Sequence, residues 1–423
     1  MPEAVIVSAA RSPIGRAFKG SLKDVRPDDL TAQVIGAALA KVPELDPRQI
    51  DDLMLGCGLP GGEQGHNLAR IVAVQMGMDY LPGATITRYC SSSLQTTRMA
   101  LHAIRAGEGD VFVSAGVETV SRSVNGSSDG MPGTMNPLFD EARARTQHRA
   151  ENGGNEGAAR SASNEGGGGR RAGWHDPRED GLLPDAYIAM GQTAENLAAL
   201  KGITRAEQDE FGVRSQNLAE AAIRSGFWQR EITPVTLPDG TVVSADDGPR
   251  AGVTLEGVSG LKPVFRPDGT VTAGNCCPLN DGAAALVVTS DTKARELGIT
   301  PLARVVSTGV SALSPEIMGY GPVEASRQAL RRAGLSIGDI DLVEINEAFA
   351  AQVIPSYRDL GVDLDRLNVN GGAIAVGHPF GMTGARITAT LINSLQWHDK
   401  QFGLETMCVG GGQGMAMVIE RLS

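Results

Sequence analysis

The order of strands and helices in this 423-residue chain occurs twice, and this repetition is the strongest constraint on its fold. In the first 120 residues, short apolar runs alternate with helical patterns, with strands at 5–9, 53–55, 84–87 and 111–117 and helices at 30–39 and from 91. The last 120 residues follow the same order, with strands at 303–306, 342–345 and 406–409 and helices at 323–333 and 385–395. Such alternation predicts a mostly parallel sheet covered by helices.

A local sequence match aligns the two halves. The run Ile50-Asp51-Asp52-Leu53 resembles Ile340-Asp341-Leu342-Val343, which lies about 290 residues later. The same offset sets the turn around Cys90 roughly against residues 377–381. We therefore interpret the chain as two duplicated α/β units whose reactive residues occupy equivalent strand-to-helix turns. Ligands of open α/β sheets gather at such turns, at the carboxyl ends of the strands.

The region between the two halves has a different composition. Residues 140–180 contain few large apolar side chains and many glycines. A packed core cannot form from such residues, so we expect a poorly ordered surface segment. A basic RNA-binding tail is the alternative interpretation of its arginines, but glutamates are interspersed among them. Helical patterning returns at 185–230, and a strand is expected at 271–285.

The net charge and the cysteine content restrict the partners and the compartment. The formal net charge of −11 argues against nucleic acid or an anionic membrane surface as a partner. The five cysteines are an odd number without the spacing of a disulfide framework, which is typical of a reducing compartment. The N-terminus runs into a strand pattern without the features of a signal peptide, and no apolar run reaches membrane-spanning length. We expect a cytoplasmic protein.

Cys90 is the first of three residues whose surroundings indicate chemistry. It lies between an apolar strand and a helix, in Thr87-Arg88-Tyr89-Cys90-Ser91-Ser92-Ser93. A thiol at a helix N-terminus is close to unpaired N–H groups and to the positive end of the helix dipole, so we expect a lowered pKa and a nucleophilic role. A buried structural cysteine at a tight turn is the alternative. The nucleophilic role also requires an imidazole nearby to generate the thiolate.

His378 and Cys408 are the other two residues. His378 follows a glycine-rich run and precedes Pro379, a setting that the other five histidines do not share. We interpret it as a functional imidazole, and a hydrogen-bonded loop histidine is the alternative. Cys408 ends a strand and is followed by glycines at 410–412. A nucleophilic thiol, an imidazole and a second thiol together suit covalent acyl transfer with proton transfer at carbon.

Other functional classes fit these motifs less well. The glycines after Cys408 lead into a strand pattern at 415–419 rather than into the helix that a dinucleotide-binding loop requires. The sequence contains no Gly-Lys-Ser or Gly-Lys-Thr phosphate loop. Cys276 and Cys277 are adjacent, a spacing that disfavours a zinc site, so we expect no metal.

These motifs, in this order, resemble the thiolase family of acetyl-CoA C-acyltransferases. The resemblance covers nearly the whole chain, and the matching segments are 11–15, the Cys90 turn, 116–122, 190–196, 272–275, 281–284, 346–350, 377–379 and 408–412. It implies a five-layered α-β-α-β-α fold made of two duplicated α/β halves with an inserted loop domain. On this basis we expect an N-terminal half at 1–120 plus 280–300, a loop domain at 121–279 that covers coenzyme A, and a C-terminal half at 301–423.

The resemblance also implies roles for residues of this chain. Cys90 resembles the family's acyl-accepting nucleophile, and His378 resembles the group that activates it and binds the thioester oxygen. Cys408 resembles the acid/base that acts at the acetyl methyl carbon. Asn346 would hold a water that forms one oxyanion site with His378, and the backbone amides of Cys90 and Gly410 would form the second. Coenzyme A is implied as a co-substrate rather than a permanently bound cofactor, and we expect a homodimer or homotetramer.

The expected contacts with coenzyme A follow from the same resemblance and are Met190, Arg250, Gly274, Cys277, Ala348 and Phe349. Several positions depart from the family pattern. Many members have glycines on both sides of the serine after the nucleophile, where this chain has Ser91 and Ser93. Cys277 stands where a serine is common, and Ala189 replaces the histidine of a His-Met-Gly motif found in many biosynthetic members. The loss of that histidine argues against strict specificity for acetoacetyl-CoA.

The sequence therefore predicts an enzyme that cleaves 3-ketoacyl-CoA with coenzyme A, or condenses two acyl-CoA units in reverse. The run Asn346-Glu347-Ala348-Phe349 favours the ordinary catalytic branch over the sterol-carrier type. One alternative is a decarboxylating ketoacyl synthase, which would not need Cys408 as a base. The other alternative is a non-catalytic acyl-CoA-binding scaffold. The presence of Cys90, His378, Asn346 and Cys408 together argues against it.

Overall fold

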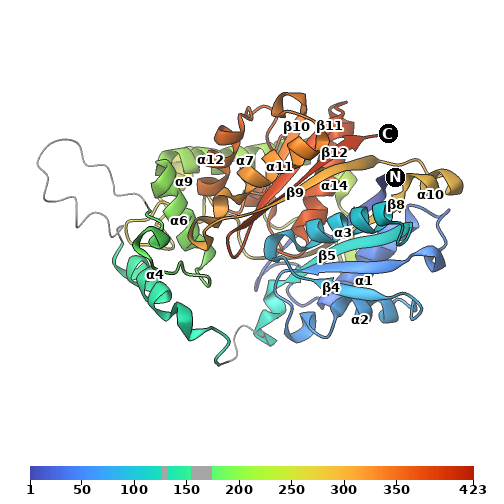
Figure 1. Ribbon diagram of the computed structural model, residues 1–423, viewed down its shortest axis with the longest axis horizontal. Coiled ribbons are helices and arrows are strands. Elements are labelled where there is room, and N and C mark those ends of the chain that lie inside the picture. The colour runs from blue at the N-terminus through green and yellow to red at the C-terminus, as the bar shows by residue number, and fades with distance from the viewer. Residues whose placement is uncertain (126–131, 154–173) are drawn as a thin grey trace, which may run out of the picture.

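The computed structural model describes residues 1–125, 132–153 and 174–423, and Figure 1 shows the chain as a layered α/β body. The strands of its main sheet are β1 (Ala4–Arg11), β2 (Gly15–Arg16), β3 (Asp52–Cys57), β4 (Gly83–Ile86), β5 (Val111–Thr119), β8 (Asn280–Ser290), β9 (Ala303–Ala312), β10 (Leu342–Ile345), β11 (Phe402–Val409) and β12 (Gln413–Arg421). Their order is β10-β11-β12-β9-β1-β8-β5-β3-β4, with β2 paired to β8. β1 and β9 join the two ends of the sheet over a short register, Val5 opposite Arg304 and Ile6 opposite Ala303.

The prediction of a mostly parallel sheet is wrong. β3 is parallel to β4 and β5, and β10 is parallel to β11, as the alternating pattern predicted. The other pairs are antiparallel, because β8 returns to lie between β1 and β5 while β12 lies between β11 and β9. The strand expected at 271–285 begins only at Asn280, because the preceding residues form a turn closed by a bond from the Asn275 amide to the Thr272 carbonyl.

The helices of the layers are α1 (Pro27–Ala40), α2 (Leu68–Gln75), α3 (Ser92–Ala106), α11 (Gly321–Ala333), α12 (Ala350–Leu360) and α14 (Thr383–Trp397). α3 and α14 form the middle layer, between the two ends of the sheet (Figure 1). Leu94 of α3 and Leu391 of α14 share one core with inward-facing residues of both ends, such as Leu286 and Met417. The two helices approach closely at Gly384, where an added Cβ would lie 2.2 Å from the Leu94 nitrogen.

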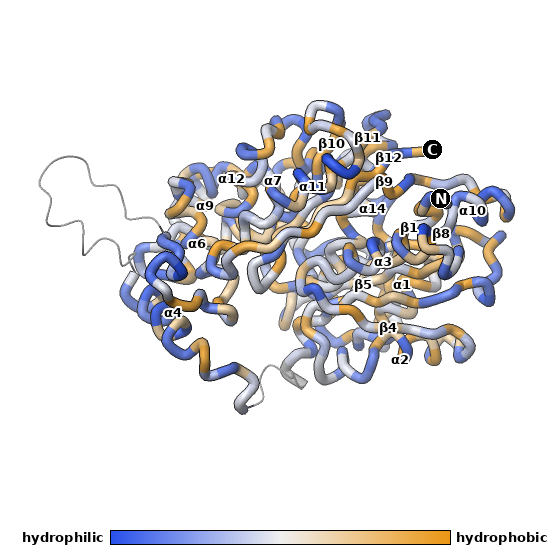
Figure 2. The backbone as a smooth tube through the Cα atoms, viewed as in Figure 1, coloured by the Kyte–Doolittle hydropathy of each residue, from blue (hydrophilic) through white to orange (hydrophobic). Residues whose placement is uncertain are grey.

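Separate cores underlie the outer layers. α1 and α2 pack on the strands of the N-terminal half, and α11 and α12 pack on those of the C-terminal half. Figure 2 shows apolar residues along the strands and hydrophilic residues at the periphery. This α-β-α-β-α order confirms the fold that the family resemblance implied. Within the described ranges, the structure contains no helix that is both long and apolar enough to cross a bilayer.

A largely helical region lies between β5 and β8 in the sequence, mostly in green in Figure 1. Its elements are α4 (Asp140–Asn152), α6 (Met190–Lys201), α7 (Arg205–Ser225), α8 (Phe227–Glu231), α9 (Leu255–Ser259) and the short pair β6 (Val235–Thr236) and β7 (Val242–Val243). Two shorter helices, α10 (Asp291–Leu297) and α13 (Ala373–Val376), belong to the connections around the main sheet.

The expectation of poor order at 140–180 is wrong for the residues that form α4. Two carboxylates in its first turn interact favourably with the helix dipole. Its inward face is fixed by Arg149, which donates to the buried carboxylate of Glu316 at 3.4 Å, and Trp174 donates to the same carboxylate at 2.8 Å. Residues 154–173 of the expected segment lie outside the described ranges.

Replacing Gly384 by Ala is expected to lower the free energy of unfolding by about 1–3 kcal/mol, because the added methyl group meets the backbone of α3 rather than a flexible side chain. Denaturant unfolding would measure this change. Gly36→Ala is the matched control, because Gly36 lies within α1 and its added Cβ has no neighbour within 4 Å. The control should raise the stability by about 0.5–1 kcal/mol. Equal effects of the two changes would contradict the close contact of α3 with α14.

Candidate active site

The turn that carries Cys90 connects β4 to α3. Cys90 lies in a short 3₁₀ turn and is only 7% exposed. The Ser92 hydroxyl donates to the Tyr89 carbonyl at 2.6 Å and accepts from the Arg88 amide at 2.9 Å. Tyr89 has a φ of 43°, in the left-handed region that few residues other than glycine adopt. Cys90 is therefore held at the start of α3 by a strained and internally bonded turn.

Burial raises the pKa of Cys90 to about 12, whereas the sequence predicted a lowered pKa. The Gly410 amide donates to the sulfur and lowers this pKa, and the negative charge of Glu118 raises it. The prediction was wrong because the loss of hydration of this largely buried thiol exceeds the effect of the helix end. Cys90 is therefore a protonated thiol at rest, and it needs a base before it can act as a nucleophile.

Cys408 and Gly410 reach the same place from the end of β11. Cys408 is fully buried, and burial raises the pKa of its thiol well above the usual range, as does a charge on Cys90. Gly410 packs against the ring of Tyr89, which an added Cβ would approach to 3.2 Å. The structure thus brings a thiol and a backbone amide of the C-terminal half to the Cys90 turn of the N-terminal half.

His378 is buried in the turn before α14. Its Nδ1 lies 2.7 Å from the Thr383 hydroxyl, and its own amide donates to Asn280 at 2.9 Å. The Asn346 side-chain nitrogen lies 3.3 Å from Nε2 and 3.4 Å from Nδ1. Burial, together with the positive charge of Arg386, lowers the pKa of His378 to about 3. The imidazole is therefore neutral and able to accept a proton.

Asn346 follows β10 and completes this group of buried polar side chains. It is 1% exposed, and its contact with the imidazole places it beside His378. Its Oδ1 is buried and has no hydrogen-bond partner in the described part of the chain. A buried acceptor of this kind is costly unless it is satisfied, so Oδ1 is available to a ligand or a solvent molecule.

Glu118 links the turns of the two halves, and the sequence analysis did not single it out. Its carboxylate, at the end of β5, accepts from the amides of Gly58 at 2.7 Å and Leu59 at 3.2 Å in the N-terminal half. It also accepts from the Gly381 amide at 2.8 Å, three residues after His378. A charge at the end of an otherwise apolar strand was the available signal, because buried charges persist only with partners.

A cavity of about 340 Å³ opens at Cys90. Both halves and the helical region contribute to its wall, which consists of Gly58, Leu59, Tyr89, Cys90, Thr134, Met135, Ala186, Tyr187, Ile188, Met190, Phe380, Gly410 and Gly411. These lining residues are uncharged and mostly apolar, so the cavity suits an uncharged chain. His378 does not line it, but its ring packs edge-on against Phe380, which does, with ring centroids 5.2 Å apart.

The expected coenzyme A contacts are divided between several places. Met190 lines the cavity. Cys277, Ala348 and Phe349 pack on the core that contains Cys408, where the Cys277 amide donates to the Ala348 carbonyl at 3.0 Å. Arg250 is exposed, does not line the cavity, and donates from its backbone amide to Gln216. The structure therefore brings four of the six residues towards the reactive thiols and leaves Arg250 apart.

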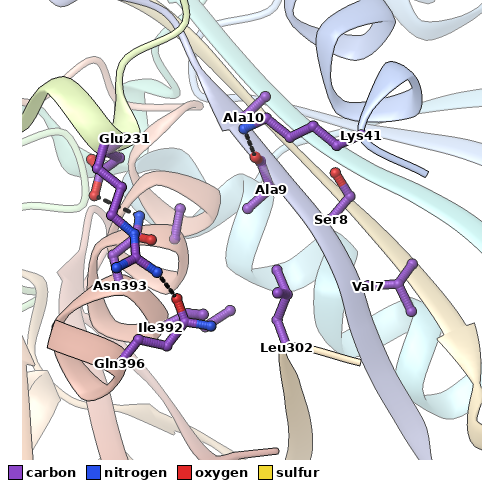
Figure 3. Close-up of a pocket in the computed structure, with 12 residues that line it drawn as sticks. Val7, Ser8, Ala9, Ala10, Lys41, Glu231, Leu302, Ile392, Asn393 and Gln396 are labelled. Carbon is purple, nitrogen blue, oxygen red and sulfur yellow. Dashed lines mark hydrogen bonds between the residues drawn. The ribbon is translucent and has the colours of Figure 1, made fainter. Parts of the chain in front are cut away.

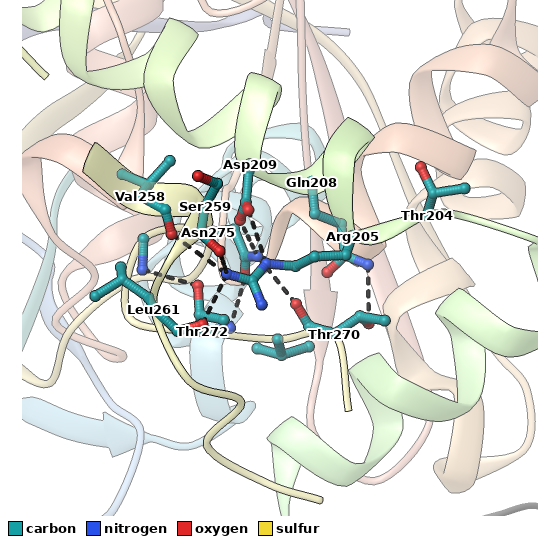
Figure 4. A network of polar contacts seen from close by, with 12 residues as sticks. Thr204, Arg205, Gln208, Asp209, Val258, Ser259, Leu261, Thr270, Thr272 and Asn275 are labelled. Carbon is teal, nitrogen blue, oxygen red and sulfur yellow. Dashed lines mark hydrogen bonds and ion pairs between the residues drawn. The ribbon is translucent and has the colours of Figure 1, made fainter. Parts of the chain in front are cut away.

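The sixth residue, Gly274, belongs to a loop that a polar network fixes (Figure 4). The buried side chain of Asn275 accepts from the Thr272 amide and donates to Asp209, both at 2.8 Å. Asp209 pairs with Arg205 at 2.7 Å, and the Arg205 guanidinium donates to carbonyls at the end of α9. The network holds the loop of Gly274 and Cys277 against α7 and α9.

A second cavity, of about 250 Å³, lies between β1, α8 and α14 and contains none of the predicted site residues (Figure 3). Its Lys41 donates to the Ala9 carbonyl at 2.6 Å. Its Glu231 accepts from the buried Arg11 at 2.8 Å and from Thr390 at 3.1 Å. Lys41 is thus bonded to β1, and Glu231 of α8 pairs with Arg11 of β1 and contacts α14, which is a structural role.

Comparison with known proteins assigns the chain to a family. The model of the thiolase N-terminal domain matches residues 4–292, and the model of the thiolase C-terminal domain matches residues 299–421. The chain belongs to the thiolase family.

Similar proteins cover this thiolase from end to end. A 3-ketoacyl-CoA thiolase of Bacillus subtilis is 40% identical over 433 aligned residues, which cover 99% of this chain and 100% of the relative. An acetyl-CoA acetyltransferase of Escherichia coli is 42% identical over 428 aligned residues and covers both chains completely. The crystal structure of the Bacillus anthracis acetyl-CoA acetyltransferase superposes with a TM-score of 0.82 at 39% identity, over 100% of this chain and 99% of the other.

Replacing Glu118 by Gln is expected to lower the free energy of unfolding of this thiolase by about 1–3 kcal/mol. The amides of Gly58 and Gly381 now donate to the Glu118 carboxylate. The NH₂ group of Gln cannot accept hydrogen bonds, so the change would leave buried donors unsatisfied. Denaturant unfolding would measure the change. Glu63→Gln is the control, because Glu63 pairs with Arg122 and Arg26 near the surface, where such pairs contribute about 0–1 kcal/mol. An unchanged stability for Glu118→Gln would rule out the proposed link between the halves.

Proposed function

We propose that this thiolase cleaves 3-ketoacyl-CoA with coenzyme A, and catalyses the reverse Claisen condensation, through an acyl group on Cys90. The proposal is supported by two groups of residues near one cavity. Cys90 lines that cavity beside Gly410 and interacts electrostatically with Cys408. His378 contacts Asn346 and packs on Phe380, which lines the same cavity. The names of the relatives, 3-ketoacyl-CoA thiolase and acetyl-CoA acetyltransferase, support this activity.

The first half-reaction begins with a proton transfer. His378 accepts the Cys90 proton, and the thiolate attacks the 3-keto carbon of the substrate. The resulting oxyanion requires preorganised donors, and the amides of Cys90 and Gly410 are proposed for this role. The carbon–carbon bond then breaks and leaves an enolate on the acetyl-CoA fragment. His378 with the group held by Asn346 would stabilise the thioester oxygen of that fragment, and Cys408 would protonate its methyl carbon.

The second half-reaction releases the acyl group. Cys408, which has given up its proton, accepts the thiol proton of incoming coenzyme A. The new thiolate attacks the acyl group on Cys90, and the acyl-CoA product leaves while Cys90 recovers its proton from His378. The uncharged cavity of about 340 Å³ suits the acyl chain, and Met190, Gly274, Cys277, Ala348 and Phe349 are proposed to lie along the coenzyme A arm. A homodimer or homotetramer in a reducing, cytoplasmic compartment completes the proposal.

The deciding experiment mixes the protein with acetoacetyl-CoA in the absence of free coenzyme A, followed by peptide mass spectrometry. An acetyl group on Cys90 that is released as acetyl-CoA when coenzyme A is added is the expected result. Absence of the adduct, despite measurable binding of coenzyme A, would overturn the catalytic assignment in favour of a binding scaffold.

Replacing Cys408 by Ala is expected to reduce kcat for thiolysis by about 10²–10⁴-fold, because the acid/base at carbon is lost. The exchange of acetyl-CoA methyl protons with deuterium in the solvent should fall equally. Cys57→Ala is the control, because Cys57 is also a buried thiol but lies at the end of β3 beside Glu118. A Cys408→Ala variant that condenses at the wild-type rate would favour a decarboxylating ketoacyl synthase instead.

Replacing Asn275 by Ala is expected to raise KM for coenzyme A more than it lowers kcat, because the loop of Gly274 and Cys277 loses its anchor on α7. Steady-state kinetics with varied coenzyme A would measure this. Asn393→Ala, at the second cavity, removes a comparable amide and should leave KM unchanged. A fall in kcat alone would place this loop outside the coenzyme A site.

A further inference from the structure

The hydroxyl of Thr383 lies between two groups of the His378 turn. Its oxygen is 2.7 Å from the Pro379 carbonyl oxygen and 2.7 Å from Nδ1 of His378. Thr383 and His378 are buried, and Thr383 is the first residue of α14. The two contacts share one hydroxyl hydrogen, so they cannot both use it.

The bond to Pro379 uses the hydroxyl hydrogen, because a carbonyl oxygen can only accept. A buried threonine at a helix commonly donates in this way to the carbonyl four residues earlier. The same arrangement occurs in α1, where Thr31 donates to the Pro27 carbonyl at 2.6 Å. The Thr383 oxygen is then an acceptor towards His378, which requires a hydrogen on Nδ1 and leaves a lone pair on Nε2.

We propose that Thr383 is a positioning residue that holds His378 in the tautomer protonated at Nδ1, so that Nε2 is the base for Cys90. This inference rests on the proposed function, in which His378 takes the proton of Cys90. In that step the S–H bond of Cys90 breaks and an N–H bond forms at Nε2, with no further reactant. The N–H group at Nε2 then donates a hydrogen bond to a substrate oxygen, before its proton returns to Cys90. One nitrogen can perform both tasks because the other keeps its own hydrogen throughout.

The other polar neighbour of the ring does not select a tautomer, because the Asn346 side-chain nitrogen lies 3.3 Å from Nε2 and 3.4 Å from Nδ1. The two contacts of the Thr383 hydroxyl therefore carry the assignment. Burial, which lowers the pKa of His378, keeps the imidazole neutral, so the position of its single hydrogen decides which nitrogen is basic.

The first measurement is a long-range ¹H–¹⁵N correlation spectrum of the ligand-free protein with ¹⁵N-labelled histidine. The chain has six histidines, and the signals of His378 are identified by their loss in His378→Asn. The expected result is a protonated Nδ1 and an unprotonated Nε2 in the wild type. A protonated Nε2 in the wild type would overturn the proposal, whatever the activity.

The second measurement is the single-turnover rate at which acetyl-CoA acetylates Cys90. Thr383→Val should slow it by about 10–100-fold, as is usual when the group that orients a catalytic imidazole is lost, and should alter the His378 spectrum. Thr383→Ser should restore both within a few-fold. Thr31→Val is the matched control, because it removes the same carbonyl bond in α1 and should change neither.

The outcomes separate this inference from the proposed function. Acetylation of Thr383→Val at the wild-type rate would overturn the role of Thr383 while leaving Cys90 as the nucleophile. Failure of the wild type to become acetylated would overturn the proposed function, and the spectrum would still test the tautomer. If Thr383→Val does not fold, the wild-type spectrum and the acetylation rate of Thr383→Ser test the role of Thr383. A serine variant that is slowed by about 10–100-fold would contradict the proposal.

Discussion

The close contact between the N-termini of α3 and α14 is the constraint on which the rest of this structure depends. Gly384 removes the side chain that would separate the two helices, and the Ser93 hydroxyl accepts from the Ala385 amide at 2.9 Å. Cys90 lies just before the first helix, and His378 lies just before the second. The duplicated halves therefore form a single site at the point where they touch, and neither half contains that site alone.

Burial keeps Cys90 and His378 of the candidate site uncharged in this ligand-free structure. Burial raises the pKa of Cys90 to about 12 and lowers the pKa of His378 to about 3, so the neutral pair is strongly favoured over the ion pair. A thiol in this state reacts slowly with oxidants and alkylating agents, which attack the thiolate. The donors of the oxyanion sites would stabilise the charge that develops when the substrate carbonyl arrives. The low polarity that suppresses the resting thiolate thus also strengthens those hydrogen bonds.

Much of the fold was predictable because the information is local. The strands and helices that the periodicity of apolar residues predicts in both halves are all present, although β9 extends to Ala312 where the expected strand ended at 306. The helices α2 and α12 were not predicted. The places of β8 and β12 in the sheet were not predictable, because pairing with distant strands leaves no mark on local spacing. α4 was missed for a related reason, since its order depends on the contact of Arg149 with Glu316.

The residues of the candidate site also fall into those that the sequence predicted and those that it did not. Cys90, His378 and Cys408 stand out because reactive side chains follow strands or glycine-rich turns, and a family resemblance assigns roles to them. The pKa of Cys90 was misjudged because burial cannot be read from a motif of seven residues. Glu118 and Thr383 were missed because their partners lie in another half or in a turn whose shape the sequence does not specify.

The position of β8 has a consequence for biosynthesis. β8 separates β1 from β5 in the sheet but follows both by a long stretch of chain. During translation the edges of β1 and β5 therefore remain unpaired until residue 290 has left the ribosome, and the middle layer lacks α14 until nearly the end of synthesis. Such non-local pairing makes folding slow and exposes apolar strand edges to neighbouring chains.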